Sequence, residues 1–212
     1  MSVNAKAVDT PSVQQQVRHI VTLLMKRPIT EAIAMEVGEI PGFEHLEIVN
    51  GEWVGLDNGE IDMGGEEHGW IEAIMITLLT TWALEKRSGR VYPGDTDFVL
   101  DGDDEELRVV RRPDVSFVAD ARVSPTKGYI YGAPDLAIEI ISPSERPGKI
   151  SEKLGEYLQF GVKQVWQVYP EKREVVVNLP DGTTTTYSDG DSLPGGDLLP
   201  GFGMDVATVF ES

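Results

Sequence analysis

Two stretches of the chain, RRPDVSFVAD at residues 111–120 and PDLAIEIISPS at residues 134–144, share one pattern. In each, a Pro-Asp step opens a short apolar run, which is typical of a buried β-strand. Side chains alternate across a strand, so Ala137, Glu139 and Ile141 share one face of the second run. The sequence therefore predicts a core strand that carries one carboxylate, Glu139, among isoleucines.

A carboxylate in so apolar a strand is costly to desolvate unless a cation or a hydrogen-bond donor meets it. Asp114, at the start of the first run, is a candidate neighbour. Two adjacent carboxylates repel each other, so one of them would protonate, whereas a bound Mg²⁺ or Mn²⁺ removes the conflict. Each residue also has a structural alternative. Asp114 can be a turn residue, and Glu139 can pair with Arg111 or Arg112.

Hydrophobic periodicity organises the rest of the chain. Helices are expected over residues 11–26, after the N-cap Thr30, over 66–87 and over about 147–160. Asn50-Gly51 predicts a tight hairpin turn, and further strands are expected over 90–100, 107–119 and 163–169, with a closing hairpin over 173–188. The strand at 135–141, the helix after it and the strand at 163–169 form a crossover, which implies parallel pairing.

These elements predict an α/β fold of the α+β kind, with a mixed central sheet flanked by helices and added hairpins. We expect residues 28–212 to form a single domain that follows an N-terminal tail and helix at residues 1–27. The stripe of apolar residues along 66–87 should pack this helix on the sheet. Tyr157 and Trp166 are interpreted as packing residues.

Composition limits the function. The 212 residues include no cysteine, which excludes disulfides and cysteine-ligated metals and fits a reducing compartment. No run of about 20 apolar residues and no signal-peptide pattern is present, so we expect a cytoplasmic protein without a membrane span. The formal net charge of −18 opposes nucleic-acid binding, because nucleic-acid binders normally neutralise phosphates with Lys and Arg.

The two Pro-Asp stretches, together with KISEKLGEYLQFGVKQVWQV at residues 149–168, resemble the PD-(D/E)XK nuclease superfamily. The resemblance is greatest to a bacterial family of restriction-endonuclease-like proteins, and it covers roughly residues 28–210. It implies a restriction-endonuclease-like core in which Asp114 and Glu139 hold Mg²⁺ or Mn²⁺. Such a metal would acidify a bound water and stabilise charge on a scissile phosphate.

One position departs from the superfamily pattern. The usual lysine stands two residues after the glutamate, and Ile141 occupies that position here. In related families the lysine has moved to the following helix, and Lys153 is in place for it. A solvated helix lysine is the alternative for Lys153. A further carboxylate often completes such sites, and Glu52, Glu67 and His68 are the candidates, which the sequence does not separate.

Two functions follow. The first is a Mg²⁺-dependent endonuclease that hydrolyses DNA phosphodiester bonds, with Asp114 and Glu139 as metal ligands and Lys153 as the residue that orients water. The second is a catalytically inactive binding or assembly module with the same fold, which could be a homodimer. The acidic charge favours this inactive module. A basic cluster could guide DNA to the site if it lines a cleft; its members are Arg108, Arg111, Arg112 and Arg122.

Overall fold

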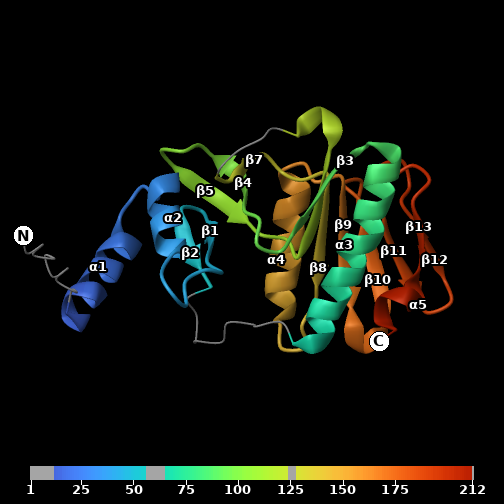
Figure 1. The fold of residues 1–212 in the computed structure, drawn as a ribbon, viewed down its shortest axis with the longest axis horizontal. Coiled ribbons are helices and arrows are strands. Elements are labelled where there is room, and N and C mark those ends of the chain that lie inside the picture. The colour runs from blue at the N-terminus through green and yellow to red at the C-terminus, as the bar shows by residue number, and fades with distance from the viewer. Residues whose placement is uncertain (1–11, 56–64, 124–127, 212) are drawn as a thin grey trace, which may run out of the picture.

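The computed structural model describes residues 12–55, 65–123 and 128–211 (Figure 1). Most of its strands fall in two sheets. The six-stranded sheet has the order β11-β10-β9-β8-β6-β3, and the five-stranded sheet has the order β2-β1-β5-β4-β7. Because parallel and antiparallel pairs occur in both, both are mixed sheets.

The strands of the six-stranded sheet are β3 (Gly89–Pro93), β6 (Val115–Ala119), β8 (Leu136–Ile140), β9 (Gln164–Tyr169), β10 (Glu174–Asn178) and β11 (Thr184–Ser188). Those of the five-stranded sheet are β1 (Glu47–Val49), β2 (Glu52–Val54), β4 (Phe98–Gly102), β5 (Leu107–Arg111) and β7 (Ile130–Tyr131). A small hairpin pairs β12 (Ser192–Pro194) with β13 (Gly203–Asp205). The helices are α1 (Val13–Met25), α2 (Glu31–Gly38), α3 (Glu66–Lys86), α4 (Pro147–Gln159) and α5 (Val206–Phe210).

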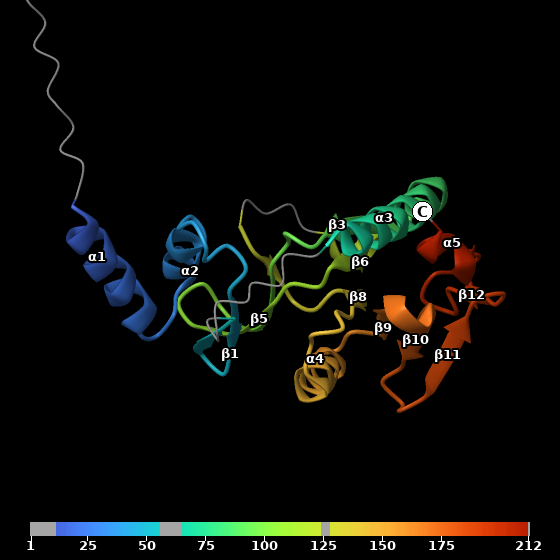
Figure 2. The same ribbon diagram turned by 90° about the horizontal axis from the view of Figure 1, so that it is seen from below.

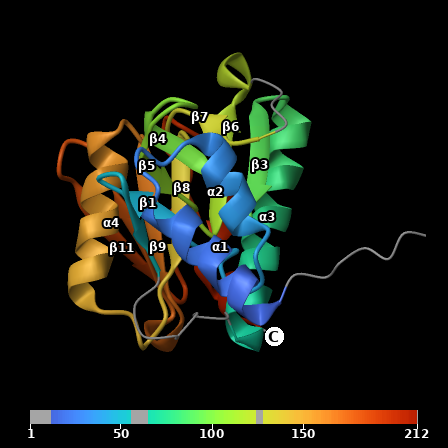
Figure 3. The same ribbon diagram turned by 90° about the vertical axis from the view of Figure 1, so that its left-hand side faces the viewer.

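Helices α3 and α4 cover opposite faces of the six-stranded sheet, as Figures 2 and 3 show. Helix α3 buries Ile71, Met75 and Leu79, which recur every four residues and therefore form one stripe against the sheet. On the other face, Tyr157 of α4 is fully buried against residues of β8 and β9. The parallel pairing of β8 with β9 across α4 confirms the predicted crossover.

Two of the passages of the chain between the two sheets are joined by an ion pair. Residues 89–102 and 107–119 each form two strands, one in each sheet, rather than the long single strands expected from the sequence. The first passage lies between β3 and β4 and the second between β5 and β6. Arg112 donates to both carboxylate oxygens of Asp97, at 2.9 Å each, so a bidentate ion pair joins the two passages.

The predicted fold class is confirmed: helices flank mixed sheets, and hairpins are added to them. The Asn50-Gly51 turn has positive φ at both positions, as a tight hairpin requires. Thr30 caps α2 by accepting a hydrogen bond from the Ile33 N–H group. Helix α1 extends from the end of the molecule that is remote from α3 (Figures 1 and 2). In the described parts of the chain, no helix has both the length and the apolar character needed to span a membrane.

Candidate active site

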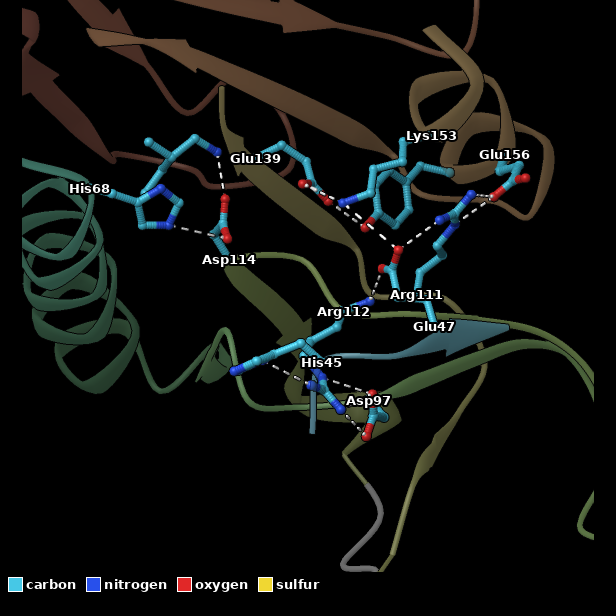
Figure 4. A network of polar contacts seen from close by, with 12 residues as sticks. His45, Glu47, His68, Asp97, Arg111, Arg112, Asp114, Glu139, Lys153 and Glu156 are labelled. Atoms are coloured by element: carbon cyan, nitrogen blue, oxygen red, sulfur yellow. Dashed lines mark hydrogen bonds and ion pairs between the residues drawn. The ribbon is translucent and has the colours of Figure 1, made fainter. Parts of the chain in front are cut away.

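Asp114 lies just before β6, where the chain enters the six-stranded sheet. The antiparallel register pairs Val115 with Ile138, which places Asp114 across from Glu139 on the neighbouring strand. One Asp114 oxygen accepts a hydrogen bond from the Ile140 N–H group at 2.6 Å, and the other lies 3.4 Å from Nε2 of His68. Asp114 is therefore fixed beside β8, and His68, at the start of α3, faces it (Figure 4).

Glu139 is buried, and both of its oxygens have partners. The Tyr157 hydroxyl donates to Oε1 at 2.6 Å, and Nζ of Lys153 lies 3.1 Å from Oε2. Burial, together with the negative charges of Asp114 and Glu47, raises the pKa of Glu139 to about 7, although Lys153 and the Tyr157 hydrogen bond oppose this effect. The negative charge of ionised Glu139 is therefore only partly compensated by its neighbours.

Lys153 reaches Glu139 from α4, which begins after the strand that carries the carboxylate. Lys153, Glu156 and Tyr157 occupy positions i, i+3 and i+4, so they share the face of α4 that packs toward the site. Burial would lower the pKa of Lys153, but the carboxylates of Glu139 and Glu47 raise it above its ordinary value. Lys153 is thus a charged ammonium whose side chain is only 23% exposed, not a solvated helix lysine.

Glu47 of β1 also enters this network. Its Oε2 lies 2.7 Å from Nη1 of Arg111 and 3.9 Å from Nζ of Lys153, and its Oε1 accepts the Arg112 backbone N–H at 3.0 Å. Arg111 in turn donates to Glu156 of α4 at 2.6 Å. Burial would raise the pKa of Glu47, but Lys153 and Arg111 lower it below its ordinary value. A carboxylate of the five-stranded sheet is therefore part of a site built mainly on the six-stranded one.

Sequence reasoning did not find Glu47 or the role of Tyr157. Tyr157 is a packing residue, as the sequence predicts, because it is fully buried against β8 and β9, and its hydroxyl in addition donates to Glu139. Tyr157 follows Lys153 by four residues, so both lie on one face of the helix, and this spacing could have indicated that both contact the same carboxylate. Glu47 gave only a weak signal, as an acidic residue that opens a short hairpin strand, because its proximity to Lys153 depends on the pairing of β1 with β5.

The three candidates for an additional site residue lie in different surroundings. His68 is beside Asp114, as described above. Glu67 is exposed in the first turn of α3. Glu52 of β2 forms an ion pair with Arg27, with its side chain 67% exposed. The structure thus brings His68 to the pair of carboxylates and gives Glu52 a partner elsewhere.

The arginines of the proposed basic cluster all face carboxylates. Their partners are Asp101 and Glu106 for Arg108, Glu47 and Glu156 for Arg111, Asp97 for Arg112, and Asp135 for Arg122. Neither Arg111 nor Arg112 pairs with Glu139, which contacts Lys153 instead. Because each positive charge is locally neutralised, these arginines do not form the cationic surface that would attract a phosphate backbone.

The residues present fit a hard divalent cation, because Asp114 and Glu139 are oxygen donors that lie across from each other on neighbouring chain segments. In the ranges that the structure describes, no cluster of three or more His, Cys, Asp or Glu residues has the geometry of a metal site. A cation between Asp114 and Glu139 would therefore take its remaining ligands from water, substrate or backbone oxygen atoms.

Known proteins that are similar to this chain identify both its fold and its family. The structure is similar to the crystal structure of a "putative nuclease belonging to DUF820" from Anabaena variabilis, with a TM-score of 0.68 and 20% sequence identity, covering 86% of this chain and 98% of that one. The chain has a nuclease-like fold. The family Uma2, described as "Putative restriction endonuclease", matches residues 40–207, and the chain belongs to this family. No curated protein matches it.

Proposed function

We propose that this protein is a Mg²⁺-dependent endonuclease that hydrolyses phosphodiester bonds of DNA, with Mn²⁺ as an alternative ion. The observation that carries the proposal is the group formed by Asp114, Glu139 and Lys153. Two carboxylates lie on adjacent strands, and an ammonium lies 3.1 Å from one of them. This combination of acidic metal donors and a fixed cation is what phosphodiester hydrolysis requires.

In this proposal Asp114 and Glu139 hold the metal ion. When bound, the ion would supply Lewis-acid stabilisation of the phosphate and a more acidic water. Hydrolysis forms a bond between the water oxygen and phosphorus and breaks the bond to the leaving sugar oxygen; the water loses a proton to solvent, and the leaving oxygen takes one up. Lys153 would donate a hydrogen bond to the attacking water, and the Tyr157 hydroxyl would keep Glu139 oriented. His68 would stabilise Asp114 from the side of α3.

DNA is the proposed substrate because the matching family is described as a restriction endonuclease. The net charge of the protein predicts how tightly it binds DNA. With a net charge of −18 and the four arginines paired, association should be weak, because the protein repels phosphates and these cations are already neutralised. The proposal includes a cytoplasmic location, which stays a prediction. The same charge favours the second candidate, a binding or assembly module that retains the fold without cleaving nucleic acid.

Activity assays at low salt separate the two candidates. The parent is incubated with plasmid, single-stranded DNA and RNA in Mg²⁺ or Mn²⁺, with a chelator control, beside Asp114→Ala, Glu139→Ala and Lys153→Ala. Cleavage of DNA by the parent alone supports the endonuclease. Equal cleavage by all four proteins identifies a contaminating nuclease. A parent that cleaves none of these substrates supports the inactive module.

A homodimer is also part of the proposal, and helix α1 supports it. Four apolar side chains at successive four-residue intervals are about half exposed or more; they are Val13, Val17, Val21 and Met25. Residues 12–27 contain no carboxylate, and besides Arg27, which pairs with Glu52, they contain Arg18 and Lys26, whereas the whole chain is strongly acidic. An apolar, cationic helix that projects from the molecule is complementary to the acidic surface of a second copy.

A further inference from the structure

The strongest unassigned feature is a buried glutamine, Gln167, beside Glu139. The parallel register of β8 and β9 pairs Glu139 with Gln167, so the two side chains lie next to each other on one face of the sheet. Val165, two residues before Gln167, packs against Tyr157, which identifies this face as the one that α4 covers. A pocket beside α4 is lined by Gln167 together with Glu139, Lys153 and Tyr157. Gln167 therefore borders the candidate site.

Only one end of the Gln167 amide is bonded. Asn178 Nδ2 donates to Oε1 of Gln167 at 3.2 Å, and the Thr184 hydroxyl donates to Oδ1 of Asn178 at 3.1 Å, so this chain of bonds fixes the direction of the amide. Among the described residues, Nε2 of Gln167 has no hydrogen-bond partner, although the residue is only 6% exposed. Because a buried donor without a partner is costly, this nitrogen is suited to an acceptor that enters the pocket.

The chemistry of the pocket favours a ligand oxygen as this acceptor. Both oxygens of Glu139 already accept hydrogen bonds, one from Lys153 and one from Tyr157. Gln167 is uncharged, so the carboxylates that neutralise the arginines of this protein do not hold it in an ion pair. In a chain with a net charge of −18, a neutral amide is therefore a donor that stays available for a phosphate oxygen.

We infer that Gln167 is a substrate-binding residue, whose Nε2 donates a hydrogen bond to a phosphate oxygen of the nucleic-acid strand at the candidate site. Asn178 and Thr184 are positioning residues that fix the direction of the amide. This inference rests on the proposed function, which brings a phosphate beside Glu139. Glu139 and Glu145 line the same pocket and oppose an anion, so the phosphate is expected to bind only together with the divalent ion.

Gln164 is a matched control on the same strand. It is as buried as Gln167, at 7% exposed, but it lies on the opposite face of β9 and both ends of its amide are bonded. Its Nε2 donates to the Gly195 carbonyl at 3.2 Å, and its Oε1 accepts from Nε1 of Trp166 at 2.9 Å. Gln164→Met should therefore lower the melting temperature. Gln167→Met should keep it near the parent value, because Asn178 Nδ2 retains two backbone acceptors.

The first measurement needs no catalytic activity. A short fluorescein-labelled DNA oligonucleotide is titrated with each protein at low salt in Ca²⁺, under conditions in which a gel shows the DNA intact, and its anisotropy gives Kd. Gln167→Met should raise Kd about tenfold, as expected for the loss of one hydrogen bond to a charged acceptor, and Gln164→Met should keep the parent Kd. A parent-like Kd in Gln167→Met, an equal rise in both variants, or a melting temperature of Gln167→Met as low as that of Gln164→Met would overturn the inference.

The second measurement, DNA cleavage in Mg²⁺ at low salt, separates this inference from the proposed function. Gln167→Met should raise KM about tenfold and keep the parent kcat, because the lost bond serves substrate binding. A parent that cleaves DNA, with the same KM in Gln167→Met, refutes the role of Gln167 alone. A parent that binds DNA without cleaving it refutes the endonuclease, while the Kd values still decide whether Gln167 contacts the strand. A parent that binds no DNA refutes both.

Discussion

Replacing Glu139 with glutamine tests the electrostatic cost of the site. Glutamine keeps the acceptor for the Tyr157 hydroxyl but removes the buried charge. In the folded protein the pKa of Glu139 is about 7, against an ordinary value of 4.5. At about 1.4 kcal/mol per pKa unit, ionised Glu139 costs about 3 kcal/mol of folding free energy when the metal is absent.

The sign of the pH dependence follows from the raised pKa. The folded protein binds the Glu139 proton more tightly than the unfolded chain does, so this contribution is fully present below about pH 4.5. It is lost as the pH rises from about 4.5 through 7. Relative to the parent, Glu139→Gln should therefore gain up to about 3 kcal/mol at pH 8 and little at pH 4.5.

Urea unfolding in the presence of a chelator, at several values between pH 4.5 and pH 8, measures the effect. Adding Mn²⁺ should then raise the stability of the parent at pH 8 and leave Glu139→Gln unchanged, because only the native parent binds the ion. A variant less stable than the parent at pH 8 would refute the reasoning. It would mean that ionised Glu139 is a net stabilising partner of Lys153, as in a structural ion pair.

Three further predictions concern Tyr157, Asp97 and Val17. Tyr157→Phe leaves Oε1 of Glu139 without its donor, so the free energy of unfolding at pH 8 should fall by about 1–3 kcal/mol. Calorimetry should also show a lower Mn²⁺ affinity, and an unchanged affinity would remove the orienting role of Tyr157. Asp97→Asn breaks the buried ion pair with Arg112 that joins the two passages between the sheets, so chemical denaturation should show a free energy of unfolding lower by about 3–5 kcal/mol. A decrease below about 1 kcal/mol would contradict the role of this pair in joining the passages. Val17→Lys should convert the proposed dimer to a monomer in light scattering, and a parent that is monomeric at all concentrations would contradict the proposed dimer.

The sequence indicated Asp114 and Glu139 because local pattern sets both positions. A Pro-Asp step marks where each apolar run begins, and strand alternation assigns the face of Glu139. The helix that follows carries Lys153 at a spacing that amphipathic periodicity can predict. These features are local in the chain, so the predicted strand with Glu139, the helix after it and their crossover to the strand at 163–169 were found in the structure.

The remaining features depend on contacts between segments that are distant in the chain. Residues 89–102 and 107–119 contain apolar runs that resemble long strands, yet each changes sheet, at Gly94–Asp97 and at Arg112–Asp114. Pro113 and Gly94 mark these points, but neither residue specifies a second sheet. Glu47 reaches Lys153 only after β1 has paired with β5, and no periodicity encodes that pairing.

The central claim is that Asp114 and Glu139 together bind a divalent cation beside Lys153. The most direct test is a crystal of the protein soaked in Mn²⁺, with diffraction data collected at the manganese absorption edge. One anomalous peak is expected within coordination distance of both carboxylates, with the Lys153 ammonium nearby. No peak at this position, in crystals that bind Mn²⁺ elsewhere, would contradict this metal site. In that result Glu139 still pairs with Lys153, and Asp114 still accepts the hydrogen bond from the Ile140 N–H group.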